Sequence, residues 1–141
     1  ETLWSYNTPS GLNYIAEWKG GRNDAKFDEL ACFTGGMLAL GSYHKAGYTD
    51  EMNAEHLKMG EALGETCYQM FHRQKSGVSP EYVRFNDAGM QTGVDFYILR
   101  PETVESMMYL WRVTKDQKWR DKGWEIYENI VRSTKVESGG T

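Results

Sequence analysis

The sequence lacks a long apolar run, a cluster of basic residues and more than two cysteines. No stretch reaches the roughly 18 apolar residues that a transmembrane helix needs, so no such helix is predicted within this chain. Lys and Arg number 16 against 20 Asp and Glu, and the net charge of −4 argues against nucleic acid as the main partner. The histidines His44, His56 and His72 have no zinc-binding spacing with the cysteines, so no zinc site is expected.

The length and composition of the chain are those of one globular domain. The 141 residues suffice for a single modest core and are too few for two domains. Hydrophobic residues make up 40% and charged residues 26% of the chain, which is an ordinary balance. Aromatic residues are frequent, at 13%, but carbohydrate sites and large cores both use them, so composition favours neither.

The apolar spacing predicts a first helix that begins near Asp24 and continues to about Gly47. Its apolar residues recur at mixed three- and four-residue spacings, which predicts a mostly buried helix. Gly35, Gly36 and Gly41 each cost about 1 kcal/mol relative to Ala inside a helix. We therefore expect these glycines to mark close packing against neighbouring elements.

Three further helices are expected over residues 50–75, 101–114 and 117–134. Thr49 resembles a cap for the second of them, and Pro101 suits the first position of the third. Residues 1–23 and 78–99 are predicted to be loops with short extended pieces. The predicted fold class is therefore all-α, with four helices in two hairpins, which fits either a small bundle or an arc of a larger helical ring.

The segment YILRPETVES, residues 97–106, places an arginine and two glutamates at a helix start. Glu102 falls in the first turn, where free backbone N–H groups and the helix dipole favour an ionised carboxylate. Glu105 lies one turn further on the same face, and Arg100 can reach either glutamate. Such a carboxylate suits a general base that activates water, or an acceptor for sugar hydroxyls. Acidic residues in a first turn also simply stabilise helices, so the spacing leaves both interpretations open.

The two cysteines, Cys32 and Cys67, both fall in predicted helices and allow one disulfide bond. On composition alone, two buried free thiols are the favoured interpretation. A disulfide would be expected only in an oxidising compartment.

Several segments together resemble the class I α-1,2-mannosidases of glycoside hydrolase family 47. The most specific is LRPETVES, followed by YLWRVT and GWE. DELACFTGGMLALG resembles a second family segment, and GLNYIAEW, GVSPEYVRFN and TKVESGG follow the family's order. The resemblance covers about residues 11–140. It implies that residues 1–141 are part of one catalytic domain, an incomplete (α/α)7 barrel of seven helical hairpins.

The resemblance also implies roles for individual residues. Glu102 matches the glutamate proposed as general base, and Arg100 and Glu105 match cavity residues that contact substrate or a calcium-bound water. Leu30 matches a cavity contact. Glu29 stands where many members have a histidine; substrate binding and an exposed helix-stabilising glutamate are both open for it. Cys32 and Cys67 match a family disulfide pair, so the resemblance favours a disulfide bond over two free thiols.

For function, the resemblance implies calcium-dependent hydrolysis of terminal α-1,2-linked mannose from high-mannose N-glycans, with inversion. The general acid and the direct calcium ligand are expected in segments outside this chain, so no metal ligand is expected within it and the isolated chain is expected to be inactive. The expected partners are the glycan and the remaining segments of the barrel. The expected location is the lumen of the Golgi or endoplasmic reticulum, with a membrane anchor upstream. The alternative is a non-catalytic lectin that recognises high-mannose glycans in quality control.

Overall fold

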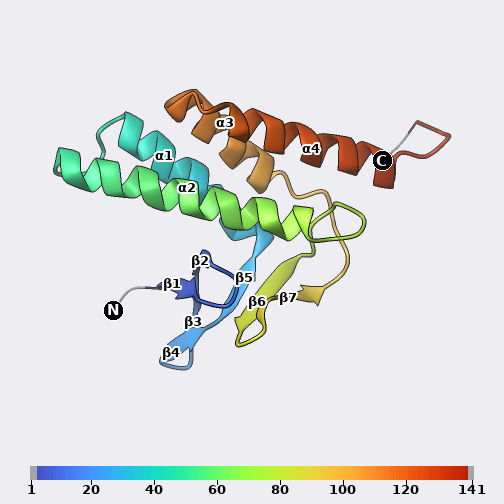
Figure 1. Cartoon of the computed structure of the whole chain (residues 1–141), viewed down its shortest axis with the longest axis horizontal. Coiled ribbons are helices and arrows are strands. Elements are labelled where there is room, and N and C mark those ends of the chain that lie inside the picture. The colour runs from blue at the N-terminus through green and yellow to red at the C-terminus, as the bar shows by residue number, and fades with distance from the viewer. Residues whose placement is uncertain (1–2, 140–141) are drawn as a thin grey trace.

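The computed structural model describes residues 3–139, in which a layer of helices lies on a layer of short strands (Figure 1). Gly140, the last residue of the TKVESGG segment, lies outside the described residues. The helical elements are the 3₁₀ turn η1 (Glu29–Cys32), α1 (Phe33–Tyr43), α2 (Asp50–His72), α3 (Glu102–Thr114) and α4 (Gln117–Thr134). The strands are β1 (Trp4–Asn7), β2 (Leu12–Ile15), β3 (Glu17–Lys19), β4 (Arg22–Asp24), β5 (Lys26–Asp28), β6 (Tyr82–Asn86) and β7 (Gly89–Val94).

The strands form three small antiparallel sheets. Two of them are local hairpins, β1–β2 and β3–β4. The third has the order β5–β6–β7, and in it Phe27 pairs with Val83 although the whole of α1 and α2 lies between them in the sequence. This sheet carries the chain from β5 directly into η1 and so fixes where η1 begins.

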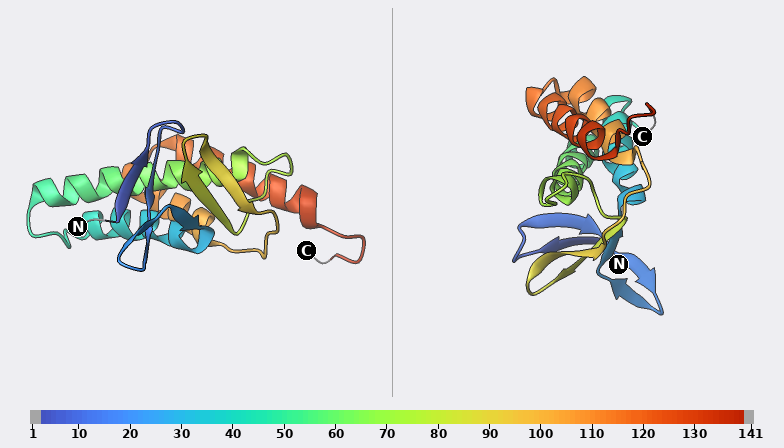
Figure 2. Two further views of the ribbon diagram at one scale, coloured as in Figure 1. Left: turned by 90° about the horizontal axis from the view of Figure 1, so that it is seen from below. Right: turned by 90° about the vertical axis from the view of Figure 1, so that its right-hand side faces the viewer.

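The helices form two antiparallel hairpins, α1–α2 and α3–α4, and Figure 2 shows all four on the same side of the strands. α2 begins at a cap in which Thr49 Oγ1 accepts a hydrogen bond from the Met52 N–H at 3.1 Å. α4 begins in the same way, with Asp116 accepting from the Lys118 N–H. α1 and α3 pack closely where Ser106 meets Gly36.

The prediction of four helices in two hairpins is confirmed, and the helices over 50–72, 102–114 and 117–134 lie close to their expected ranges. The predicted start of the first helix is wrong: Asp24 ends β4, residues 26–28 form β5, and α1 begins only at Phe33. Pairing of β5 with β6 is a long-range interaction that overrides the local helical pattern. The extended pieces also pair into three sheets, which is more β structure than an all-α class contains.

The helix–sheet junction and the helix–helix junction each have a buried cluster. The first contains Phe27, Leu63 and Val83, together with both cysteines. The second contains Phe71, Leu110, Trp119 and Ile126 between the helices. None of the helices within residues 3–139 is long and apolar enough to cross a membrane.

The expectation that the first helix is mostly buried is wrong for one of its faces. Phe33, Met37 and Tyr43 on α1 are 46%, 52% and 67% exposed. The glycines lie on the opposite, buried part: Gly35 faces the backbone of α2, and Gly36 faces α3. Gly41 has only the Ala46 Cβ near it, at 3.9 Å, so the expectation of close packing holds for Gly35 and Gly36 and fails for Gly41.

Candidate active site

The candidate site lies at the N-terminus of α3, where the chain arrives from β7 through residues 95–101. Leu99 has a φ of 60°, a left-handed conformation that is uncommon for a residue with a Cβ. The Tyr97 hydroxyl donates a hydrogen bond to the carbonyl oxygen of Arg100 at 2.7 Å. This contact and the turn at Leu99 hold Arg100 at the entrance to the helix.

Arg100 pairs with a glutamate that the spacing did not predict. Its Nε donates to Glu81 Oε2 at 2.7 Å, and the side chain of Glu81 is only 10% exposed. This hydrogen bond raises the pKa of the Arg100 guanidinium. The prediction that Arg100 pairs with Glu102 or Glu105 is wrong, because the GVSPE segment before β6 places Glu81 beside it.

Glu29 is fully buried, so an exposed helix-stabilising glutamate is the wrong interpretation. Its Oε1 accepts hydrogen bonds from the backbone N–H and the hydroxyl of Thr103, at 3.2 and 2.8 Å. A carboxyl on η1 therefore caps the first turn of α3 from outside that helix. Burial, opposed by the Thr103 hydrogen bonds and assisted by the neighbouring Glu102, raises the pKa of Glu29 to about 7.

Glu102 is the first residue of α3 and is half-buried. Its Oε2 is buried, and nothing among residues 3–139 donates a hydrogen bond to it. The same is true of Oε2 on Glu29 and Oε1 on Glu81. Three carboxyl groups therefore converge at the start of α3, with Arg100 as the guanidinium that pairs with one of them.

The other two predicted site residues lie at the edge of this cluster. Glu105 is exposed one turn further along α3, and it lines a hollow of about 200 Å³ with Gly36 and Tyr109. Leu30 follows Glu29 directly and is 48% exposed. The structure thus places Glu29, Arg100 and Glu102 together and leaves Glu105 and Leu30 at the open surface beside them.

Sequence reasoning missed Glu81, Thr103 and Tyr97, the three residues that hold the predicted ones in place. Glu81 lies in the quoted segment GVSPEYVRFN, but its distance along the chain from Arg100 gave no sign of their pairing. Thr103 and Tyr97 lie inside YILRPETVES, where their partners became visible only from the three-dimensional arrangement. Burial beside the carboxyl groups also raises the pKa of the Tyr97 phenol, which therefore stays neutral.

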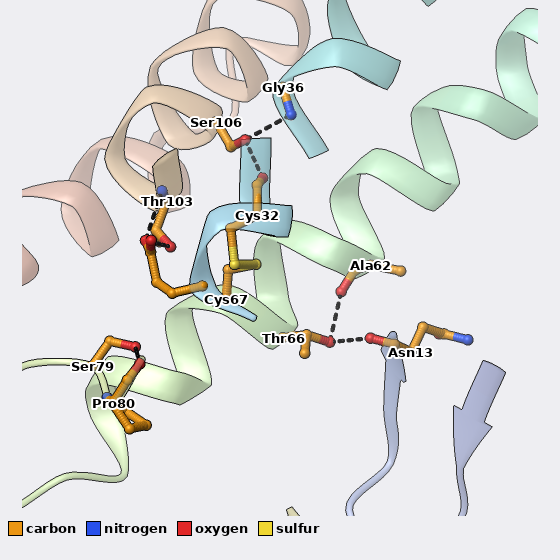
Figure 3. Close-up of a disulfide and its surroundings, with 11 residues drawn as sticks. Asn13, Cys32, Gly36, Ala62, Thr66, Cys67, Ser79, Pro80, Thr103 and Ser106 are labelled. Carbon is orange, nitrogen blue, oxygen red and sulfur yellow. Dashed lines mark hydrogen bonds between the residues drawn. A yellow bond between two sulfur atoms is a disulfide. The ribbon is translucent and has the colours of Figure 1, made fainter. Parts of the chain in front are cut away.

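The disulfide that the resemblance implied is present and joins η1, which carries Glu29, to α2. Cys32, the last residue of η1, is bonded to Cys67 on α2, and both are fully buried (Figure 3). Ser106 on α3 bridges the same region: its hydroxyl donates to the Cys32 carbonyl at 2.5 Å and accepts from the Gly36 N–H at 2.8 Å (Figure 3). These contacts fix η1, and therefore Glu29, relative to the first turn of α3.

The described residues do not form a calcium site by themselves. Within residues 3–139, no group of three His, Cys, Asp or Glu side chains is placed to hold a metal ion. Calcium takes six to eight oxygen ligands in most proteins, and a carboxyl group with a raised pKa is a poor one. The raised pKa of Glu29 suits this carboxyl group to proton chemistry.

Carboxyl groups that converge at the start of a helix, in a frame of helical hairpins, are the kind of site that glycoside hydrolases use. The comparisons with known proteins agree with this class. The family model of glycosyl hydrolase family 47 matches residues 1–141, so the chain belongs to that family.

Among curated proteins, the chain is similar to the human endoplasmic reticulum mannosyl-oligosaccharide 1,2-alpha-mannosidase, with 43% identity over 98% of the chain. It is 42% identical to the mannosyl-oligosaccharide 1,2-alpha-mannosidase of Candida albicans over 95% of the chain. Among solved structures, it is similar to the alpha-1,2-mannosidase from Trichoderma reesei, with a TM-score of 0.87 and 25% identity over 99% of the chain.

The chain is much shorter than these relatives. It covers 20% of the human protein, 27% of the Candida protein and 32% of the fungal structure. The structural match therefore places these helices within a larger family domain, of which this chain forms one part.

Proposed function

We propose that the protein containing this chain hydrolyses terminal α-1,2-linked mannose from high-mannose N-glycans, with inversion at the anomeric carbon. The observation that carries this proposal is Glu102, a half-buried carboxylate at the N-terminus of α3 within a cluster of carboxyl groups. The names of the human and Candida relatives, which are 1,2-alpha-mannosidases, support the substrate class.

In this mechanism Glu102 acts as the general base. Its carboxylate takes a proton from a water molecule, whose oxygen attacks the anomeric carbon from the face opposite the leaving sugar. A general acid from a segment outside this chain protonates the departing glycosidic oxygen. Inverting enzymes leave about 6.5–9.5 Å between the two carboxyl groups to make room for the water.

The other predicted residues bind or orient the substrate in this proposal. Arg100, fixed by Glu81, presents its guanidinium beside Glu102 and can donate to sugar hydroxyls. Glu105 and Leu30 lie at the open surface next to the cluster, where a sugar ring can contact them. We include the calcium dependence of the whole protein in the proposal, with direct ligands outside this chain.

The remaining segments of the barrel are the proposed partners of the exposed face of α1. Leu30, Phe33, Met37 and Tyr43 leave large apolar surfaces uncovered on this side. The chain covers only 32% of the similar fungal structure, so enough chain lies outside it to cover them. The isolated chain lacks the proposed acid and is expected to be inactive.

We also place the whole protein in the lumen of the Golgi or endoplasmic reticulum, held there by a membrane anchor outside this chain. The fully buried Cys32–Cys67 disulfide supports an oxidising compartment. The name of the human relative, an endoplasmic reticulum enzyme, supports the same pathway.

The test is mannose release from a nine-mannose N-glycan by the full-length protein and by its Glu102→Gln variant. The variant keeps the size of the side chain but cannot accept the proton, so we expect release to fall by at least about 100-fold. Circular dichroism should be the same for both proteins. Addition of a chelator to the wild-type protein should also abolish release.

Release by the Glu102→Gln variant at the wild-type rate would remove Glu102 as the base. Binding of the glycan without release by the wild-type protein would instead support a lectin.

A further inference from the structure

Glu29 has an arrangement that neither substrate binding nor helix capping explains fully. Both of its hydrogen bonds from Thr103 end on the same oxygen, Oε1. The other oxygen, Oε2, is buried without a partner that could donate to it. An ionised carboxylate buried in this way leaves one charged oxygen unsatisfied, which costs several kcal/mol in typical protein interiors.

A protonated Glu29 removes this problem. In a carboxylic acid one oxygen is a carbonyl that accepts, and the other is a hydroxyl that donates. Oε1 already accepts twice, so the hydroxyl falls on Oε2. The carboxyl group of Glu102 lies close enough to that of Glu29 to raise the pKa of Glu29, and its own Oε2 is a second buried oxygen to which nothing among residues 3–139 donates. One proton between the two carboxyl groups satisfies both oxygens.

The charged groups around the pair favour the same assignment. Glu81 accepts a hydrogen bond from Arg100 and forms an ion pair with it. Tyr97 stays neutral, and Thr103 contributes only neutral donors to Glu29. Ionisation of both Glu29 and Glu102 would place two negative charges close together, while the guanidinium of Arg100 is already paired with Glu81. Two carboxyl groups in contact then hold one proton between them.

Resting on the proposed function, we infer that Glu29 is a positioning residue: its protonated carboxyl donates a hydrogen bond to Glu102 and holds that base in place. This bond occupies one oxygen of Glu102 and leaves the other for the attacking water. The proton belongs on Glu29, because Glu102 lies at the N-terminus of α3, where the helix dipole favours its negative charge. When Glu29 loses this proton, the hydrogen bond to Glu102 is lost and the negative charge of Glu29 repels Glu102. Glu102 is then free to turn away from the water.

The direct test is infrared difference spectroscopy of the full-length protein as the pH is raised. The wild type should show a protonated-carboxyl C=O band that disappears around pH 7, and Glu29→Gln should lack it. The matched control is Glu105→Gln, which changes an exposed carboxylate one turn away and should keep the band. Absence of the band in the wild type, or its persistence in Glu29→Gln, overturns the inference.

The second readout is the pH dependence of mannose release. Glu29→Gln keeps a donor towards Glu102 but cannot ionise, so the loss of kcat above pH 7 should shift to higher pH. Glu29→Leu removes the donor and should lower kcat at least tenfold with KM changed less than threefold. Glu29→Gln, which keeps the donor, should have a kcat much closer to the wild-type value than Glu29→Leu has. Equal losses in both variants, or an unshifted pH profile, contradict a positioning role.

The spectroscopic test separates this inference from the proposed function. A titrating band that vanishes in Glu29→Gln establishes the shared proton even if the wild-type protein releases no mannose. In that case the proposed function fails and the shared proton stands. Should Glu29→Leu fail to fold, the band and the pH profile of Glu29→Gln still decide the inference.

Discussion

Arg100 reaches its position through a residue that lies far from it in the sequence. The buried carboxylate of Glu81 accepts from its Nε, and Tyr97 holds its backbone carbonyl. Glu81 therefore holds the guanidinium of Arg100, and Tyr97 holds its backbone, before a ligand arrives. Preorganisation of this kind lowers the entropic cost of orienting a substrate.

The substitution Glu81→Gln should lower kcat/KM, although Glu81 itself is not proposed to contact the reacting atoms. The amide is the same size but leaves Arg100 without its charged partner, so the guanidinium becomes free to turn away. We expect kcat/KM for mannose release by the full-length protein to fall about 10- to 100-fold, since small misplacements cost this much. Glu17→Gln is the matched control, because it removes a surface partner of Lys26 away from the site. Unchanged kcat/KM in Glu81→Gln would show that the pair does not orient Arg100.

The pH dependence of stability follows from Glu29. Its pKa of about 7 in the folded protein lies above 4.5, the ordinary value for a glutamate side chain. The folded state therefore binds more protons than the unfolded state between about pH 4.5 and 7, so this group's contribution to stability falls as the pH rises through that window. The total change is on the order of 3 kcal/mol, because each pKa unit corresponds to about 1.4 kcal/mol.

Thermal unfolding of the full-length protein at pH 5 and pH 8 measures this effect. The Tm of Glu29→Gln relative to the wild type should be higher at pH 8 than at pH 5, because only the wild type carries the buried ionised group at pH 8. Glu105→Gln should show no such difference. A Tm difference between Glu29→Gln and the wild type that is equal at both pH values would contradict the raised pKa.

The residue roles that could be predicted from sequence were those carried by a local motif. Glu102 and Arg100 stood out because a helix start, a proline and two glutamates lie within six residues. Glu29 was identified as a site position, but its burial depends on β5, whose strand pairing brings η1 under α3. Glu81 was missed because its contact with Arg100 joins segments that only the folded chain brings together.

At the scale of the elements, the contact between α1 and α3 depends on Gly36. A Cβ at this position would lie 2.9 Å from the Ser106 Cα, closer than side chains normally approach a backbone. Replacement by alanine must push the two helices apart at the point where Ser106 also bonds to Cys32 and Gly36. The helix glycines were predicted to pack closely, and this is the position where the structure confirms it most clearly.

Gly36→Ala should therefore destabilise the full-length protein by about 1–3 kcal/mol, the usual cost of overpacking. Gly41→Ala is the matched control on the same helix, since its Cβ would meet only Ala46 at 3.9 Å. That change should stabilise by up to about 1 kcal/mol, because alanine favours the helix. Chemical denaturation measures both, and equal effects of the two substitutions would contradict close packing at Gly36.

The boundaries of the helices show which structural features were readable from sequence. α2 and α4 begin at side-chain caps, Thr49 and Asp116, and their limits were predicted closely. The start of α1 was placed too early because residues 26–28 fit a helical pattern yet pair with β6. Local propensity cannot report a partner strand more than 50 residues away.

At the scale of the whole molecule, the Cys32–Cys67 disulfide joins η1 to α2 across 35 positions of sequence. Closing a loop of this length should stabilise the protein by about 3–4 kcal/mol in the chain-entropy model. Cys32→Ser with Cys67→Ser should lower the free energy of unfolding by this amount, and the wild type under reducing conditions should approach the same value. Two free thiols in the denatured, non-reduced wild type would contradict the bond.

The larger architecture was only partly predictable from these residues. The two hairpins followed from apolar periodicity, whereas the small sheets under them came from pairings that periodicity does not reveal. The barrel was implied by resemblance alone, and the structural match to the Trichoderma reesei enzyme supports its fold for this part of the domain. A closed barrel for the whole protein stays a prediction.

The most direct measurement of Glu102 as a base is the anomeric form of the first mannose released by the full-length protein, followed by proton NMR. A base that activates water on the opposite face produces β-mannose first, which then mutarotates. Initial release of α-mannose would contradict this mechanism, because retention requires a covalent intermediate and a carboxylate nucleophile only about 5–5.5 Å from the acid.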